Sequence, residues 1–205
     1  GAAGWFFLRG VPPAKQLAPN HAQIVRLLNL VRNDAEITEI EAVLKQDVTL
    51  PYKLLRYINS AGFGLMVEVQ SFRHAVTILG RDKLNKWLSL LLVSASKDPT
   101  APAVMQAAIA RARMMEILGA HFFDKNQLDN LFITGAFSLL NVLLGTTMDV
   151  ILEQMTLPEA VRDALLMNEG AYAPLLRLAI ASETFMPDQL RKQAEALGLS
   201  DQQIT

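Results

Sequence analysis

Apolar residues recur at intervals of three and four positions from residue 20 almost to the end of the chain, which predicts a series of helices. Asn20 is expected to cap the first helix, and Thr38 with Glu41 forms the capping-box pattern that predicts the start of the second. A wide apolar stripe follows over residues 81–96. The positions expected to be buried in these helices are Ile24, Leu27, Leu28, Val31, Ile40, Val43, Leu44, Leu84, Trp87, Leu88, Leu91 and Leu92.

Glycine and proline punctuate the second half of the chain. The residues 97–102 contain two prolines and form the clearest internal break, but the flanking helices are too apolar to stand alone. No segment alternates apolar and polar positions between hairpin turns. We therefore predict an all-α fold with a single multi-helix domain. Its later helices are expected over residues 104–118, 128–144, 147–155, 156–169, 174–185 and 187–197, with Gly119, Gly145, Gly170 and Gly198 after four of them.

The residues 47–80 predict two short helices that flank a tight corner. Pro51 suits the first turn of the first helix, and Gly80 can end the second. Asn and Gly tolerate left-handed backbone, and Ser competes for backbone hydrogen bonds, so the residues between should stop a helix. We expect an ordered corner, with Phe63 buried as its anchor, formed by Asn59, Ser60, Phe63 and Gly64.

This stretch resembles the signature of the HDOD domain, a family of bacterial signalling modules related to HD phosphohydrolases. The resemblance is specific over residues 46–80 and extends more weakly from about residue 17 to the end. It implies an HD-like helical bundle that generally lacks the metal site of the hydrolases. The chain is most similar to HDOD domains that follow an EAL domain, the cyclic-di-GMP phosphodiesterase fold. The residues that carry the resemblance are Gln46, Asp47, Lys53, Leu54, Leu55, Arg56, Asn59, Ser60, Ala61, Phe63, Gly64 and the run 75–80.

Composition narrows the classes of protein that the chain can belong to. Its 205 residues are 51% hydrophobic and include no cysteine, so a sizeable core is affordable whereas disulfides and thiolate metal sites are excluded. The net charge of −1 gives no overall attraction to nucleic acid or to an anionic membrane. The uncharged run over residues 130–148 is interrupted by polar residues, which favours a buried helix over a membrane span. We expect a cytoplasmic protein with no nucleic-acid or membrane partner.

Metal-dependent hydrolysis requires clustered histidine and carboxylate ligands. The chain has three histidines, His21, His74 and His121, and none of them precedes an acidic residue. In the resemblance to HD enzymes, Ser138 and Leu139 stand where a metal-binding His-Asp pair would be. We therefore expect no catalytic residue, no metal ligand and no cofactor. The alternatives are a degenerate HD-type metal-dependent phosphohydrolase and a sensor that binds a small ligand in its helical core.

Charge is distributed unevenly along the chain. Residues 51–90 contain six basic against two acidic side chains, whereas residues 145–205 contain nine acidic against four basic ones. A basic surface of this kind can dock an acidic partner. The candidate docking residues are Arg73, Arg81, Lys83 and Lys86. The expected partner is a separate protein or a neighbouring EAL domain in the same chain, and a homodimer is kept as an alternative.

The two ends of the chain suggest a longer parent protein. Residues 1–15 hold the aromatic cluster Trp5, Phe6 and Phe7 and resemble a linker or the remnant of a preceding EAL domain, with the HDOD-like helical domain over residues 16–205. Ser200 and Gln203 have the spacing of a capping box, which would start a further helix beyond the last residue. We expect a non-catalytic signal-transduction or protein-interaction module linked to cyclic-di-GMP phosphodiesterase function.

Overall fold

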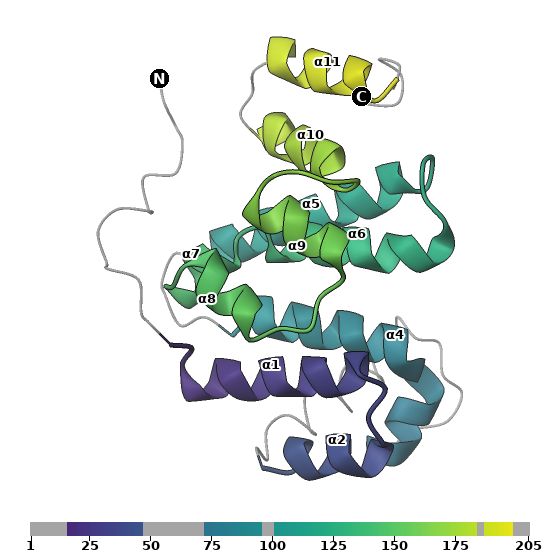
Figure 1. Cartoon of the computed structure of the whole chain (residues 1–205), viewed down its shortest axis with the longest axis vertical. Helices are drawn as coiled ribbons and strands as arrows, with labels where there is room; N and C mark the ends of the chain where they lie inside the picture. Colours follow the sequence, from purple (N-terminus) through teal and green to yellow (C-terminus); the bar gives the residue numbers. More distant parts are fainter. Residues whose placement is uncertain (1–15, 47–71, 96–100, 184–186, 199–205) are drawn as a thin grey trace. The chain divides into compact units, whose positions relative to one another are not determined.

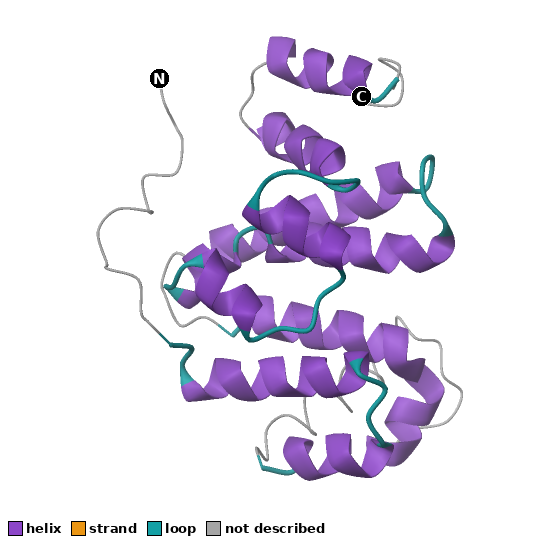
Figure 2. Cartoon of the chain, in the orientation of Figure 1, coloured by secondary structure: helices purple, strands orange, loops and turns teal. Residues whose placement is uncertain are grey.

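The described residues of the computed structural model form helices connected by short loops, without a β-strand (Figures 1 and 2). They cover 16–46, 72–95, 101–183 and 187–198. The all-α fold class is therefore confirmed. The chain divides into two compact units, Ala18–Leu92 and a second unit that joins Gly1–Leu17 to Val93–Thr205.

The Ala18–Leu92 unit contains helices α1 (Pro19–Arg32), α2 (Ile37–Leu44) and α4 (Phe72–Val93), whose last residue already belongs to the second unit. Helix α1 packs against α2. The apolar stripes predicted from the periodicity are buried, except that Leu91 is only half-buried. The predicted corner residues Asn59, Ser60, Phe63 and Gly64 lie outside the described residues.

Both predicted helix starts in this unit are wrong by two residues. Helix α1 begins at Pro19, with Ala18 as its N-cap, so Asn20 lies inside the first turn. Proline is favoured there because its missing N–H is not needed for the helix ladder. Helix α2 begins at Ile37 after an extended Glu36, so Thr38 does not cap it.

Gly80 interrupts α4, as the sequence predicts. Its backbone has φ 73° and ψ 169°, which is outside the helical region and is far more accessible to glycine than to other residues. The helix therefore consists of two segments joined by a kink, with residues 72–79 before it and residues 81–93 after it. Each segment buries its own apolar face, including Ala75 and Leu79 before the kink and Leu84 and Leu88 after it.

The second unit contains seven helices within its described residues, from α5 to α11 (Figure 1). Helices α5 and α6 form an antiparallel pair, α9 packs on α6, and α10 packs on α5 and α9. Helix α11 lies against α10. Their bounds are α5 Ala101–Gly119, α6 Lys125–Phe137, α7 Leu140–Leu144, α8 Met148–Glu153, α9 Glu159–Leu166, α10 Ala173–Glu183 and α11 Pro187–Ala196.

Small residues allow α5 and α6 to approach closely. A Cβ atom added at Gly135 on α6 would lie 2.6 Å from the Cα atom of Ala112 on α5. This is a contact with backbone, which cannot rotate away. Asp124 and Gln127 form a capping box that starts α6, with the Asp124 N–H donating to the Gln127 side-chain oxygen at 3.2 Å. The tight pair forms the centre of the second unit.

The uncharged run over residues 130–148 forms part of this packed interior. It is divided between α6 and α7, and Leu131, Ile133 and Leu140 in it are at most 1% exposed. Within the described ranges, no helix combines the length and apolarity that a bilayer crossing requires.

Candidate functional site

The three histidines lie on different elements of the chain. His21 is buried on α1, whereas His74 on α4 and His121 just after α5 are exposed. The His121 Nδ1 atom lies 3.3 Å from the backbone oxygen of Leu118. Among the described residues, no group of three His, Cys, Asp or Glu side chains could hold a metal ion.

Ser138 and Leu139, expected to lie inside one long helix over residues 128–144, instead form the break between α6 and α7. Ser138 is the C-cap of α6, and Leu139 has the non-helical backbone angles φ −121° and ψ 14°. The Ser138 hydroxyl donates to the Gly135 carbonyl at 2.7 Å, which satisfies an oxygen at the end of α6. Leu139 is 6% exposed and thus faces the core.

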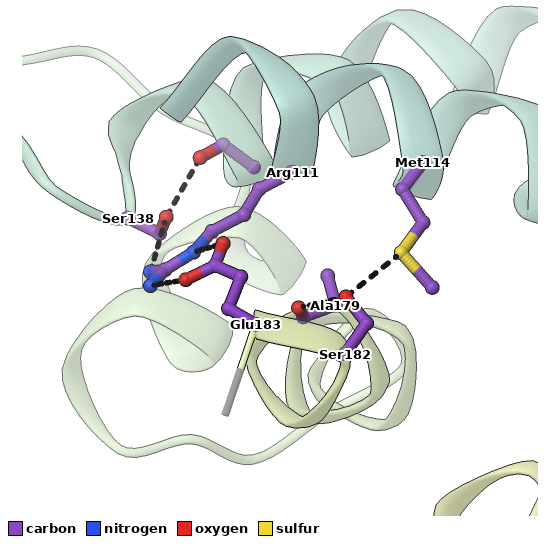
Figure 3. Close-up of polar contacts among 7 residues, drawn as sticks. Arg111, Met114, Ser138, Ala179, Ser182 and Glu183 are labelled. Atoms are coloured by element: carbon purple, nitrogen blue, oxygen red, sulfur yellow. Dashed lines mark hydrogen bonds and ion pairs between the residues drawn. The ribbon is translucent and has the colours of Figure 1, made fainter. Parts of the chain in front are cut away.

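The guanidinium of Arg111 lies at this break (Figure 3). Its Nε and Nη2 atoms donate to the two carboxylate oxygens of Glu183 at 2.6 and 2.7 Å. Its Nη1 atom donates to the Ser138 hydroxyl oxygen at 3.1 Å. The cluster thus joins α5, the end of α6 and the last residue of α10.

Because the cluster is largely buried, its loss should reduce the stability of the fold substantially. The Arg111 side chain is 5% exposed and that of Glu183 is 22% exposed. Bidentate pairing of a guanidinium with a carboxylate combines charge with matched geometry. Removing one member of a buried pair costs about 3–5 kcal/mol, because the other charge stays desolvated. In this arrangement the guanidinium holds a carboxylate, the side chain of Glu183.

Neither Arg111 nor Glu183 was selected from the sequence. One signal was available, because Arg111 lies on the face of α5 that also carries Ala108 and Met115, both fully buried. A charged residue on an apolar helix face requires a partner. The partner lies 72 positions along the chain, and no periodicity links the two.

The four basic residues selected from the sequence all lie on α4, but they are not equivalent. Arg73 precedes the kink and forms an ion pair with Glu41 at 3.3 Å. Arg81 forms an ion pair with Asp34 at 3.4 Å and donates to the Ala35 carbonyl at 2.9 Å. Both arginines therefore form ion pairs within the Ala18–Leu92 unit. Lys83 is exposed and Lys86 is half-buried.

A further arginine contributes to the cohesion of this unit. The Arg32 Nε atom at the end of α1 donates to the Asn85 side-chain oxygen on α4 at 3.0 Å. Burial lowers the pKa of Arg32 to about 10. The guanidinium is still protonated at neutral pH, so it joins α1 to α4 as a charged donor.

The fold and these sites coincide with a match to a family model, the HDOD domain, over residues 16–161. The match covers well over half of the chain, so the chain belongs to the HDOD family. The match includes residues of both compact units and ends at residue 161. Arg111 and Ser138 lie inside the matched region, whereas Glu183 lies beyond it.

Two curated relatives are similar to most of the chain. The cyclic di-GMP phosphodiesterase CdgJ of Vibrio cholerae is 30% identical over 177 residues, which are 85% of this chain and 41% of CdgJ. The uncharacterized protein YuxH of Bacillus subtilis is 24% identical over 180 residues, which are 85% of this chain and 44% of YuxH. The chain thus spans less than half the length of both relatives. No solved structure matches it significantly.

Proposed function

We propose that the chain is a non-catalytic signalling module that acts by docking its helices on a protein partner or on a neighbouring EAL domain. The proposal rests on the two side chains at the break between α6 and α7, Ser138 and Leu139. The resemblance to HD enzymes assigns a metal pair to these two residues. A hydroxyl that bonds to a guanidinium and a buried leucine occupy their place.

The link to cyclic-di-GMP comes from the relatives. CdgJ is named a cyclic di-GMP phosphodiesterase, and the region similar to this chain is 41% of it. The remaining part of CdgJ is long enough to hold a catalytic domain of its own. By this reasoning the module regulates a phosphodiesterase in the bacterial cytoplasm and does not itself hydrolyse the dinucleotide.

The first test separates a docking module from a hydrolase. The purified chain is incubated with cyclic-di-GMP in the presence of Mn²⁺ or Mg²⁺, and its metal content is measured after purification. We expect neither turnover nor a stoichiometric transition metal. Turnover that is lost when a His or Asp side chain is removed would establish the degenerate hydrolase instead.

The second test addresses regulation. In CdgJ, the region similar to this chain is either deleted or replaced by this chain, and hydrolysis of cyclic-di-GMP is compared. We expect the replacement to restore the rate toward that of intact CdgJ, with weaker restoration by the variant Lys83→Glu/Lys86→Glu. Equal rates for deletion and replacement would contradict a regulatory role for this module in CdgJ.

A further inference from the structure

The guanidinium of Arg111 is held in place by more than its carboxylate partner. Its Nη1 atom donates to Ser138, whose own hydroxyl proton is directed to the Gly135 carbonyl at the end of α6. The C-terminal end of a helix carries partial negative charge and favours a nearby cation. The contact with Ser138 therefore orients the Arg111 guanidinium independently of Glu183.

Glu183 has the properties expected of a ligand for the Arg111 guanidinium. It is the last residue of α10, and a negative charge at a helix C-terminus is unfavourable unless a cation offsets it. Its side chain retains 22% exposure, against 5% for Arg111, so the carboxylate approaches a buried cation from the solvent side. Both carboxylate oxygens are used in the bidentate contact (Figure 3).

We propose that Arg111 and Ser138 form a carboxylate-binding site in which Glu183 is the resident ligand. Its specificity follows from the parallel Nε and Nη2 donors, which match the two coplanar oxygens of a carboxylate. A carboxylate from another source occupies the same place when Glu183 is absent. This inference is independent of the proposed docking function.

The site also fixes the end of the last well-buried helix. Helix α10 buries six of its eleven residues, whereas Ala194 is the one buried side chain among those described in α11, which rests on α10. The hydroxyl of Ser182, beside Glu183, lies 3.5 Å from the Met114 sulfur on α5. Occupation of the Arg111 site by Glu183 therefore holds the C-terminal turn of α10 on α5.

Chemical rescue tests the site directly, with formate as the probe. The variant Glu183→Ala removes the carboxylate and leaves space for a small one. In sodium chloride its Tm should fall by about 10 °C, because Arg111 is left buried without this partner. Sodium formate at the same ionic strength should restore at least half of that loss, while the wild-type Tm differs little between the two salts.

Two matched variants separate binding at the site from a general salt effect. In Glu183→Gln the side chain fills the space without the charge, so formate should give no specific gain. In Arg111→Met/Glu183→Ala the cation is absent, so formate and chloride should act alike. Equal Tm values for Glu183→Ala in the two salts, or a gain from formate that persists without Arg111, would overturn the proposal.

If Glu183→Ala is unfolded in chloride, the readout becomes the yield of folded protein after refolding in formate or in chloride. A higher yield in formate that requires Arg111 supports the site. Equal yields reject it and leave Arg111 and Glu183 as an ordinary structural ion pair.

Discussion

The two compact units of the chain use their charged residues in different ways. In the unit that contains Val93–Thr205, Arg111 is buried and uses three of its nitrogen atoms within one polar cluster. In the Ala18–Leu92 unit, Arg73 and Glu41 pair at the surface, with 58% and 22% of their side chains exposed. In the first of these units the charge of Arg111 is buried in a bidentate cluster, whereas in the other a surface pair accompanies the partly buried Arg32, which joins α1 to α4.

The two units also differ in how much space surrounds the glycines of their helices. Helices α5 and α6 approach so closely at Gly135 that even a methyl group has no space. Helix α4 instead bends at Gly80, where an added Cβ would meet nothing within 4 Å. We expect substitutions at the centre of the second unit to affect folding, whereas those at the proposed docking residues of α4 should affect capture of a partner.

The largest effect is expected from Leu139→Asp, which places a carboxylate at a buried position between α6 and α7. An unpaired charge in the core should lower the free energy of unfolding by about 5 kcal/mol or prevent folding. Urea denaturation followed by circular dichroism measures the loss. Leu139→Met, which conserves volume, should cost less than about 1.5 kcal/mol. A stable Leu139→Asp protein that binds Mn²⁺ would mean that a metal pocket is still present.

Arg111 and Glu183 give the next largest effect, with an asymmetry that follows from their burial. Glu183→Met leaves a cation that is 5% exposed and should cost about 3–5 kcal/mol. Arg111→Met should cost less, since the Glu183 carboxylate is already 22% exposed and can turn toward water. The double variant should be more stable than Glu183→Met alone, as a double-mutant cycle in urea would show. Additive losses would mean that the two side chains are not coupled.

Gly135→Ala tests the close approach of α5 and α6. The added methyl group would overlap the backbone of Ala112, so the helices must separate, at a cost of about 3 kcal/mol. Gly145→Ala is the matched control, because Gly145 has φ 64° and open space around it. Strain in the left-handed backbone alone should cost about 1–2 kcal/mol there. If Gly145→Ala proved the more harmful of the two in urea denaturation, the helix crossing would be looser than described.

These expectations show which features the sequence could reveal. The helical period identified Leu27, Leu28 and Leu88 as core residues because burial of one helix face leaves a repeating pattern. Gly80 and Gly145 were identified as stops because left-handed backbone favours glycine, and both have positive φ. Helix starts were less reliable, since Asn20 and Thr38 have capping side chains but lie within their first turns.

Other features depend on contacts between distant parts of the chain. The break at Ser138 falls within a continuous apolar stretch, so residues 128–144 read as one helix. The break brings the Ser138 hydroxyl to Arg111, and Arg111 in turn holds Glu183. Local helix propensity cannot predict this arrangement, because it depends on contacts between residues that are far apart in the sequence.

A smaller effect on stability, but a measurable one on binding, is expected from Lys83→Glu/Lys86→Glu on α4. Stability should change by less than about 1 kcal/mol, because charges near the surface contribute little. Capture of the docking partner should weaken, most strongly at low salt. Arg191→Glu/Lys192→Glu makes the same change in charge at exposed positions of α11 and should leave capture unaltered. Equal capture by both variants over a salt series would exclude Lys83 and Lys86 from the docking surface.

The smallest effect is expected from Glu41→Gln, which asks whether Arg73 serves the fold or the docking surface. The hydrogen bond from Lys45 and the positive charges of Lys45 and Arg73 lower the pKa of the Glu41 carboxyl. Since this pKa is lower in the folded than in the unfolded state, the carboxylate stabilises the fold above its ordinary pKa, and the effect is lost as the pH falls through the folded pKa. The Tm of the variant should therefore be slightly below that of the wild type at neutral pH, and the difference should disappear in acid.

Loss of the Glu41 charge also releases Arg73, so a docking surface that includes Arg73 should capture an acidic partner more tightly at neutral pH. Unchanged capture, with the pH-dependent difference in Tm intact, would assign Arg73 to the fold and leave Arg81, Lys83 and Lys86 as the remaining candidates for docking.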